Sequence, residues 1–291
     1  MIDRAALATL AAVLRSGSFD RASARLGVTP SAVSQRIKAL EEQMGAALIL
    51  RGTPCTATPL GARLLRHADA VGALEAQLLG EIGESGGAMP TLRIAVTADS
   101  LATWLMPALA SVKDVLFDLV IDDQDHSADW LRRGEVAGAL TARARPVQGC
   151  DAVQLGALRY HAAASPSYLA RWFPKGLTPE AASTAPMLQF NAKDALQHQW
   201  LRGQLGAEIA PLAHQIASAQ GFRDAAFAGL GWGMIPAGLI EDDLSRGRLA
   251  LLAPDPLDQP LTWQTPRATK ATTTALTAAI RHAARTGLVA V

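Results

Sequence analysis

The spacing of apolar residues changes abruptly at the glycine-rich segment 83–90, GESGGAMP. Before this segment, apolar residues recur every three or four positions, which is the period of an amphipathic helix. After it, short apolar runs such as TLRIAV and FDLVID alternate with helical stretches, which is typical of a mainly parallel α/β fold. The sequence therefore predicts a helical N-terminal unit, a flexible joint, and an α/β body that we expect to form two lobes.

Three helices separated by tight turns are predicted for the first 45 residues. A helix over 3–15 is indicated by the spacing of Leu7, Leu10 and Leu14, and a short helix follows over 19–26. Thr29 then offers an N-cap oxygen, and Pro30 has the φ angle of a first helical residue. The third helix carries one apolar stripe, which consists of Val33, Ile37, Leu40 and Met44.

The other face of this third helix carries small and hydrogen-bonding side chains. Ser31, Ser34 and Gln35 would let a backbone approach a major groove and bond to base edges. The following segment, LILRGTPCTATPLG, is typical of a short β-wing, and helix-turn-helix plus wing indicates DNA binding, although helix pairs also occur in other all-α domains. The predicted DNA-contacting residues are Thr29, Pro30, Ser31, Ser34, Gln35, Arg36, Lys38 and Arg51, the basic ones for phosphates or a groove edge.

Charge is distributed unevenly along the chain. Residues 1–66 contain nine Lys and Arg against four acidic residues, which is a net charge of +5. The whole chain has a net charge of +1, so the remainder carries −4. A basic N-terminal unit on an acidic body indicates two partners of different chemistry.

A long helix is predicted between the wing and the joint. Thr58 and Pro59 repeat the cap signal, and apolar residues continue at helical spacing for roughly 25 residues, or about 35 Å. A solitary helix of this length with one apolar edge needs a partner, and its own copy in a second chain is the simplest one. We therefore expect a homodimer formed through this linker helix.

The segment SGSFDRASARLGVTPSAVSQRIKALEEQMGAALILR, followed by TPLG, resembles the signature of the LysR-type transcriptional regulators. Further along, TADSLATWLMPAL, LRRGEVAGAL and LGALRY resemble the arginine- and lysine-responsive branch of that family, the ArgP (IciA) and LysG regulators. One departure is Pro30-Ser31, where many members of the family have Gln-Pro. This difference affects the expected base contacts and not the expected fold.

The resemblance implies a winged helix-turn-helix over 1–58, a linker helix and hinge over 59–90, and a two-lobed α/β effector domain over 91–291 that resembles periplasmic binding proteins. Lobe I would comprise about 91–162 and 266–291, and lobe II about 163–265. It also implies a homodimer or tetramer on double-stranded DNA, with RNA polymerase as a further partner. The expected effector is L-lysine or L-arginine, without a cofactor, and the expected target is an amino-acid exporter or metabolic gene.

Several residues are candidates for holding that effector. Thr97, Asp99 and Ser100 lie between a predicted strand and a predicted helix, where N–H groups can bind a carboxylate. Asp99 could instead only cap the helix. Asp123, in the run IDDQD, is a candidate for a cationic side chain, or else part of a solvated loop. The family resemblance adds candidates from the second lobe, which are Phe190, Asn191 and Ser218.

Other functional classes fit the sequence less well. A nucleoid-associated DNA binder or replication-initiation inhibitor with little ligand control stays open as the alternative. A solute-binding protein would need an export signal and no helix-turn-helix. An enzyme is not expected, because no pairing of a nucleophile with a base emerges from the sequence. The segment GESGG matches a hydrolase motif but lacks the strand before and the helix after that a hydrolase nucleophile requires. Neither the cysteines nor the histidines have the spacing of a metal site. No apolar run is long enough to span a membrane. We expect a cytoplasmic, nucleoid-associated protein.

Overall fold

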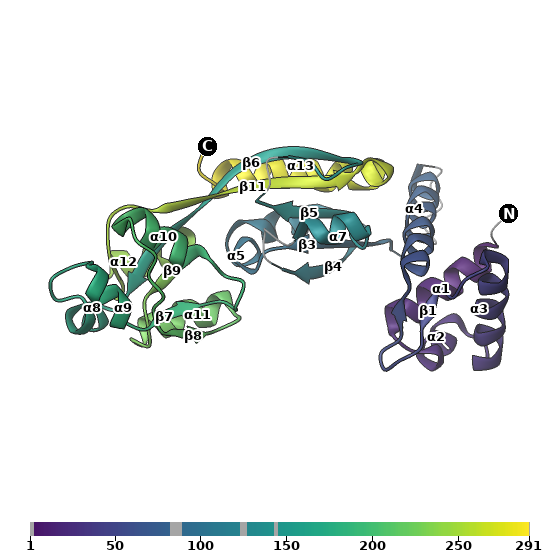
Figure 1. The fold of residues 1–291 in the computed structure, drawn as a ribbon. Coiled ribbons are helices and arrows are strands. Elements are labelled where there is room, and N and C mark those ends of the chain that lie inside the picture. The colour runs from purple at the N-terminus through teal and green to yellow at the C-terminus, as the bar shows by residue number, and fades with distance from the viewer. Residues whose placement is uncertain (1–2, 82–88, 123–126, 143–144, 291) are drawn as a thin grey trace.

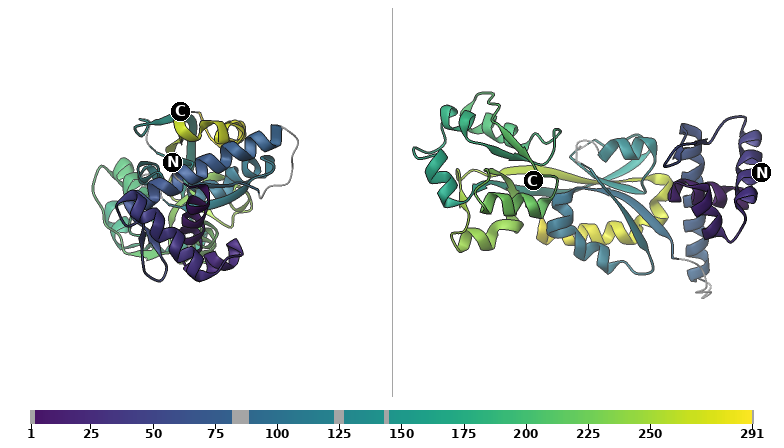
Figure 2. Two further views of the ribbon diagram at one scale, coloured as in Figure 1. Left: turned by 90° about the vertical axis from the view of Figure 1, so that its right-hand side faces the viewer. Right: turned by 90° about the horizontal axis from the view of Figure 1, so that it is seen from below.

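The structure of the protein is a computed structural model that describes residues 3–81, 89–122, 127–142 and 145–290. A helical head lies at one end and a two-lobed body extends from it (Figure 1). The right-hand view of Figure 2 shows the head and the two lobes in sequence along one long axis. Asp123, Asp125 and the segment GESGG lie outside the described residues.

The head has the helix-turn-helix arrangement that the sequence predicts. Its elements are α1 (Arg4–Ser16), α2 (Phe19–Leu26), α3 (Pro30–Met44), β1 (Ile49–Leu50), β2 (Thr56–Ala57) and α4 (Pro59–Glu81). The predicted cap is confirmed, since the Thr29 hydroxyl accepts a hydrogen bond from Ala32 N at 3.2 Å. Leu10 of α1, Ala22 of α2 and Val33 of α3 meet in one buried core.

The wing is attached to the head by side-chain hydrogen bonds as well as by its own short ladder. β1 and β2 pair antiparallel, and the Glu41 carboxylate on α3 accepts hydrogen bonds from Leu48 N at 2.7 Å and Ile49 N at 3.4 Å. Thr58 joins the end of the wing to α4, since its hydroxyl donates to Ala47 O at 2.8 Å and accepts from Gly61 N at 3.0 Å. The recognition helix, the wing and the linker helix therefore share one framework.

Helices and strands alternate along the body. Its helical elements are α5 (Ala98–Ser100), the π-helical turn Leu101–Leu105, α6 (Met106–Ser111), α7 (Ser127–Arg133), α8 (Pro166–Trp172), α9 (Pro179–Thr184), α10 (Leu196–Leu205), α11 (Ala219–Phe227), α12 (Ala237–Ser245), the 3-10 turn Arg267–Thr269 and α13 (Lys270–Gly287). Its strands are β3 (Thr91–Val96), β4 (Leu116–Ile121), β5 (Gly138–Thr141), β6 (Cys150–Ala164), β7 (Met187–Gln189), β8 (Ala213–Gln215), β9 (Gly233–Pro236), β10 (Ala250–Leu251) and β11 (Leu257–Pro266).

The sheet of the body is mixed, so the expectation of a mainly parallel sheet is wrong in part. The strand order is β10-β6-β11-β5-β3-β4, with β9 paired to β6. In this sheet the pairs β3–β4 and β3–β5 are parallel, but β11 runs antiparallel to both β5 and β6. The reason is that β6 leads out to the second lobe and β11 returns from it, so these neighbours must run in opposite directions. β7 and β8 form a separate two-stranded parallel sheet.

The two long strands β6 and β11 connect the lobes. One lobe contains β3, β4, β5 and α7, the other contains α8 to α12 with β7 and β8, and β6 with β11 pass along one side of both (Figure 1). Trp104 and Trp232 are 5% and 0% exposed and serve as packing residues. Both belong to the core that continues from one lobe to the other.

The close approach of α4 to the wing depends on a glycine. A Cβ atom added at Gly61 would lie 1.9 Å from the Leu48 carbonyl oxygen, which belongs to the backbone. By contrast, a Cβ at Gly203, inside α10, would meet nothing within 4 Å. The first glycine is therefore required by packing and the second is not.

We expect Gly61→Ala to lower the free energy of unfolding of the head by about 1–3 kcal/mol, because the added methyl group forces α4 away from the wing. Gly203→Ala is the matched control and should leave stability unchanged or raise it by up to about 1 kcal/mol, since alanine favours the helix. Urea unfolding followed by circular dichroism measures both. Equal stability of the two variants would contradict the close contact.

Candidate functional site

The face of α3 opposite the core is exposed along its whole length. Val33, Ile37 and Leu40 are 0%, 1% and 1% exposed and hold α3 in the head. The residues predicted to contact DNA all lie at the surface, and they are Thr29, Pro30, Ser31, Ser34, Gln35, Arg36, Lys38 and Arg51. One face of α3 is therefore structural, and the opposite face is available to a ligand.

Some of these exposed side chains have partners within the head. The Thr29 hydroxyl accepts the cap hydrogen bond of α3, so it serves the helix. Lys38 lies 3.7 Å from the Glu42 carboxylate, a weak exposed pair that a phosphate can replace. The Arg51 guanidinium lies 5.3 Å from the centre of the Phe19 ring, which orients this wing residue toward the side of α2.

A second candidate site is a cavity of about 920 Å³, including its open mouth, between the two lobes. Its walls come from the β3–α5 turn and the end of β4 in one lobe, and from segment 190–199, α11 and β9 in the other. Gln259 on the connecting strand β11 closes one side. The lining residues are Thr97, Ala98, Asp99, Ile121, Asp122, Phe190, Asn191, Lys193, Asp194, Ala195, Leu196, Gln199, Ala219, Phe222, Met234, Ile235, Pro236 and Gln259.

Four of the seven predicted effector residues line this cavity, namely Thr97, Asp99, Phe190 and Asn191. Ser100 does not line it, because its side chain is completely buried behind the turn. Ser218 does not line it either, since its hydroxyl caps α11 by accepting from Gly221 N at 3.1 Å. Asp123 lies outside the described residues, and its neighbour Asp122 lines the cavity.

The β3–α5 turn presents an acid and a helix start to the cavity. Tyr160 on β6 donates its hydroxyl to Asp99 Oδ2 at 2.8 Å, which fixes the direction of that carboxylate. The Thr97 hydroxyl donates to Ser100 Oγ at 2.8 Å and accepts from Ser100 N at 3.1 Å. The Thr97 hydroxyl therefore serves as a helix cap, so any donor groups for an anion here come from the backbone of the first turn.

The segment 190–195 forms a rigid loop that the sequence reading missed as a unit. The Asp194 carboxylate accepts hydrogen bonds from Phe190 N at 2.9 Å and Leu196 N at 3.1 Å. The Asn191 side-chain oxygen accepts from Lys193 N at 2.7 Å. The sequence signal was the string FNAKDAL, in which Asn and Asp can both bond to nearby backbone N–H groups.

Asp122 connects the cavity to both lobes. One of its oxygens, Oδ2, accepts a hydrogen bond from the Trp130 indole at 2.8 Å, and Oδ1 lies 3.7 Å from Lys193 Nζ across the cavity. Trp130 on α7 in turn contacts two guanidinium groups, those of Arg93 at 5.7 Å and Arg133 at 4.6 Å from its ring centre. The hydrogen bond from Trp130 of α7 therefore holds the Asp122 carboxylate in place while it faces the other lobe.

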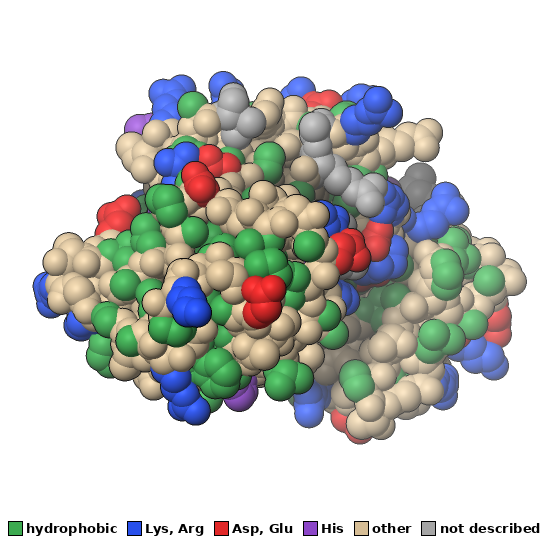
Figure 3. All heavy atoms as spheres, turned by 60° about the vertical axis from the view of Figure 1, so that its left-hand side comes forward, with side chains coloured by type: hydrophobic (Ala, Val, Ile, Leu, Met, Phe, Trp, Pro, Cys, Tyr) green, Lys and Arg blue, Asp and Glu red, His purple; other side chains and the backbone are tan. Residues whose placement is uncertain are grey.

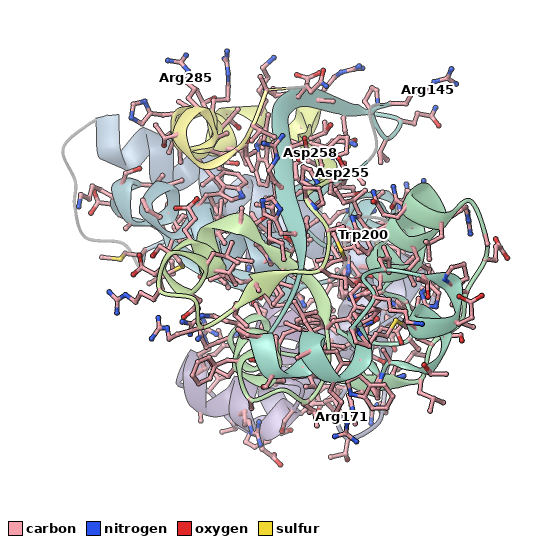
Figure 4. The ribbon with its side chains drawn as sticks, turned by 90° about the vertical axis from the view of Figure 1, so that its left-hand side faces the viewer. Arg145, Arg171, Trp200, Asp255, Asp258 and Arg285 are labelled. Atoms are coloured by element: carbon pink, nitrogen blue, oxygen red, sulfur yellow. The ribbon has the colours of Figure 1, made fainter. Side chains whose placement is uncertain are left out.

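The lining of the cavity carries more acidic than basic side chains. Asp99, Asp122 and Asp194 line it against a single base, Lys193, and such a lining attracts cations. Lys and Arg side chains gather along the upper edge of the body, over β6 and α13 (Figure 3). Arg145 and Arg285 point away from the body at this edge (Figure 4).

The connecting strands are fixed by side-chain interactions at two places. Arg159 on β6 forms a double hydrogen bond with Asp258 on β11, at 2.8 and 2.7 Å, and this partner lowers the pKa of the Asp258 carboxyl. At the start of β11, the Trp200 indole donates to Asp255 O at 2.9 Å, and Figure 4 shows Trp200 below Asp255. The strands therefore form a stiff support for the cavity.

Within the described part of the chain, no helix is long and apolar enough to cross a bilayer. The same residues contain no group of three or more His, Cys, Asp or Glu side chains arranged to hold a metal ion. Cys55 and Cys150 are both free.

Comparison with known proteins identifies both parts of the chain. Residues 5–62 match the bacterial regulatory helix-turn-helix protein, lysR family, and residues 85–286 match the LysR substrate binding domain. The regulator LysG of Mycobacterium tuberculosis is 45% identical over 264 residues, which cover 90% of this chain and 87% of that protein.

Two solved structures have the same architecture. The crystal structure of ArgP from Mycobacterium tuberculosis superposes with a TM-score of 0.85 at 43% identity, covering 100% of this chain and 99% of that one. Full-length LysG from Corynebacterium glutamicum with bound effector Arg gives a TM-score of 0.72 at 35% identity, covering 99% of this chain and 100% of that one. The chain therefore belongs to the LysR family of bacterial helix-turn-helix transcriptional regulators.

Proposed function

We propose that this regulator responds to a basic amino acid, L-lysine or L-arginine, that binds in the cavity between the lobes. The observation that carries the proposal is the lining, with three acidic side chains and one basic side chain. A basic amino acid has two cationic groups and one carboxylate, so it complements this charge pattern. The arginine-bound structure of the Corynebacterium glutamicum relative supports the same class of ligand.

The two ends of the ligand would meet different parts of the cavity. Asp99 and Asp122 would each face a cationic group, and the backbone N–H groups at the start of α5 would face the carboxylate. Phe190 and Phe222 provide apolar surface for the aliphatic stem, and both line the same cavity. Contacts from both lobes at once would favour one relative arrangement of the lobes over the others.

In isothermal titration calorimetry, we expect binding of arginine or lysine, and we expect Asp99→Asn to weaken it about 10-fold or more, because one charge-assisted contact is lost. Asparagine keeps an oxygen that can accept the Tyr160 hydroxyl, so the fold should survive. Asp242→Asn on α12, an exposed acid outside the cavity lining, is the control. Absence of heat and of a thermal shift with both amino acids would contradict the proposed ligand.

We further propose that the exposed face of α3 reads a major groove while Arg36, Lys38 and the wing residue Arg51 contact phosphates. The support is that this face contains only exposed polar or small side chains, whereas the buried face alone holds α3 in place. A homodimer formed through α4 would present two such heads to two half-sites. The regulated gene would encode an amino-acid exporter or a metabolic enzyme, with RNA polymerase as a further partner in the cytoplasm.

We expect Ser31→Ala with Gln35→Ala to weaken binding to the target promoter about 10-fold and to relax its sequence preference, because base-edge hydrogen bonds are lost. A mobility-shift assay with wild-type and scrambled promoter DNA measures both effects. Ser183→Ala with Gln154→Ala makes the same chemical changes at exposed sites in the body and should have no effect. Long footprints with weak sequence preference in the wild type would instead indicate a nucleoid-associated binder.

We also propose that α7 transmits ligand binding to the linker helix. Asp122 is bonded to Trp130 on α7, and at the end of α7 the Arg133 carbonyl accepts a hydrogen bond from the Arg66 guanidinium of α4. Burial, and then the neighbouring Arg63, lower the pKa of Arg66, which still remains charged at neutral pH. A ligand that binds Asp122 is therefore connected through α7 to the linker helix.

We expect Trp130→Phe to reduce the effect of the amino acid on promoter affinity by about 0.5–2 kcal/mol, because phenylalanine keeps a ring against Arg133 but cannot donate to Asp122. Fluorescence anisotropy of labelled promoter DNA with and without the amino acid gives this coupling free energy. Trp172→Phe is the control, since Trp172 also stacks on an arginine, Arg171, at 5.0 Å, but lies outside this route. Unchanged coupling in Trp130→Phe would rule α7 out.

A further inference from the structure

An ion pair bridges the cavity from one lobe to the other. Asp122 follows β4 in the first lobe, and Lys193 belongs to the loop after β7 in the second lobe. Lys193 Nζ lies 3.7 Å from Asp122 Oδ1, and both residues line the cavity. A cationic side chain of the protein is therefore already located where the lining most favours a cation.

The two partners are held with very different rigidity. The Asp122 carboxylate is 21% exposed, and the Trp130 indole fixes its other oxygen at 2.8 Å. The Lys193 side chain is 53% exposed, and its ammonium lies at the end of a flexible four-carbon stem. The carboxylate is thus a fixed acceptor, and the ammonium is a movable occupant.

The backbone of Lys193 is nevertheless fixed toward the cavity. Its N–H group donates to the Asn191 side chain at 2.7 Å, and the Asp194 carboxylate closes the same loop onto Phe190 N and Leu196 N. Because the loop is rigid and the stem is flexible, Lys193 can leave Asp122 without any rearrangement of the main chain.

We propose that Lys193 is a built-in competitor of the effector. Its ammonium group occupies Asp122 in the empty cavity and is displaced by the side-chain cation of the incoming ligand. This inference rests on the proposed response to a basic amino acid. It assigns to Lys193 a role in specificity, because a ligand of the same shape with an uncharged side chain brings no side-chain cation with which to displace the ammonium group.

The exchange has a low cost because of where the pair lies. Half-exposed ion pairs contribute little stability and are screened by salt, so the bridge holds the empty lobes only weakly. When a ligand cation takes the place of Lys193, the contact between the lobes passes through the ligand. The ion pair therefore lowers, by a small amount, the affinity for a ligand whose cation must displace Lys193 from Asp122.

The test measures binding of arginine and of citrulline, its analogue with an uncharged side chain, by calorimetry to the full-length wild type and to Lys193→Ala. We expect Lys193→Ala to bind arginine about two- to fivefold more tightly, since the competitor is gone, and to bind citrulline with unchanged affinity. Lys175→Ala, at an exposed site in the same lobe and outside the cavity, should match the wild type. In an Asp122→Asn background, Lys193→Ala should have no further effect on arginine binding, because the two groups act as a pair.

The outcomes separate this inference from the proposed function. If the wild type binds arginine and Lys193→Ala binds it equally or more weakly, the competitor role is wrong, and weaker binding would instead place Lys193 on the ligand carboxylate. If neither the wild type nor Lys193→Ala binds arginine or lysine, the proposed function itself fails and the inference with it.

Discussion

The antiparallel pairing of β6 and β11 is the constraint on which the body of this protein depends. These two strands are the path by which the chain leaves the first lobe and returns to it, and they pair over ten residue positions. The two strands are hydrogen-bonded to each other and are also joined by the side chains of Arg159 and Asp258. This stiff connection holds the lobes apart and leaves a cavity between them. The residues of that cavity come from turns and strand ends that each lobe positions separately.

Two kinds of interaction have different roles within the cavity. Hydrogen bonds within one lobe, such as Tyr160 to Asp99 and Trp130 to Asp122, orient the acidic groups before any ligand arrives. The Asp122 and Lys193 pair acts between the lobes and is exposed and weak by comparison. A regulator needs this combination, because a pre-oriented site gives affinity and a weak bridge leaves the relative arrangement of the lobes responsive to a ligand.

Most features of the head, but not all, follow from short-range sequence patterns. The cap at Thr29, the apolar stripe of α3 and the length of α4 follow from period, capping and turn chemistry, and the structure reproduces them. The contact between α4 and the wing, where Gly61 lies against the Leu48 carbonyl, has no local signal. Glycine there could equally have indicated a turn, and only the packed head shows that it is needed for close approach.

The sequence by itself determined the helix-turn-helix head, the linker helix, the two-part organisation and a cavity edge near Thr97 and Asp99, because these depend on short-range patterns. Only the tertiary structure decided that Ser100 and Ser218 serve as buried and capping groups, that the sheet is mixed, and that Lys193 lies opposite Asp122. The physical reason is separation along the chain, since Asp122 and Lys193 are brought together by the packing of two lobes, and no pattern in either segment specifies the other.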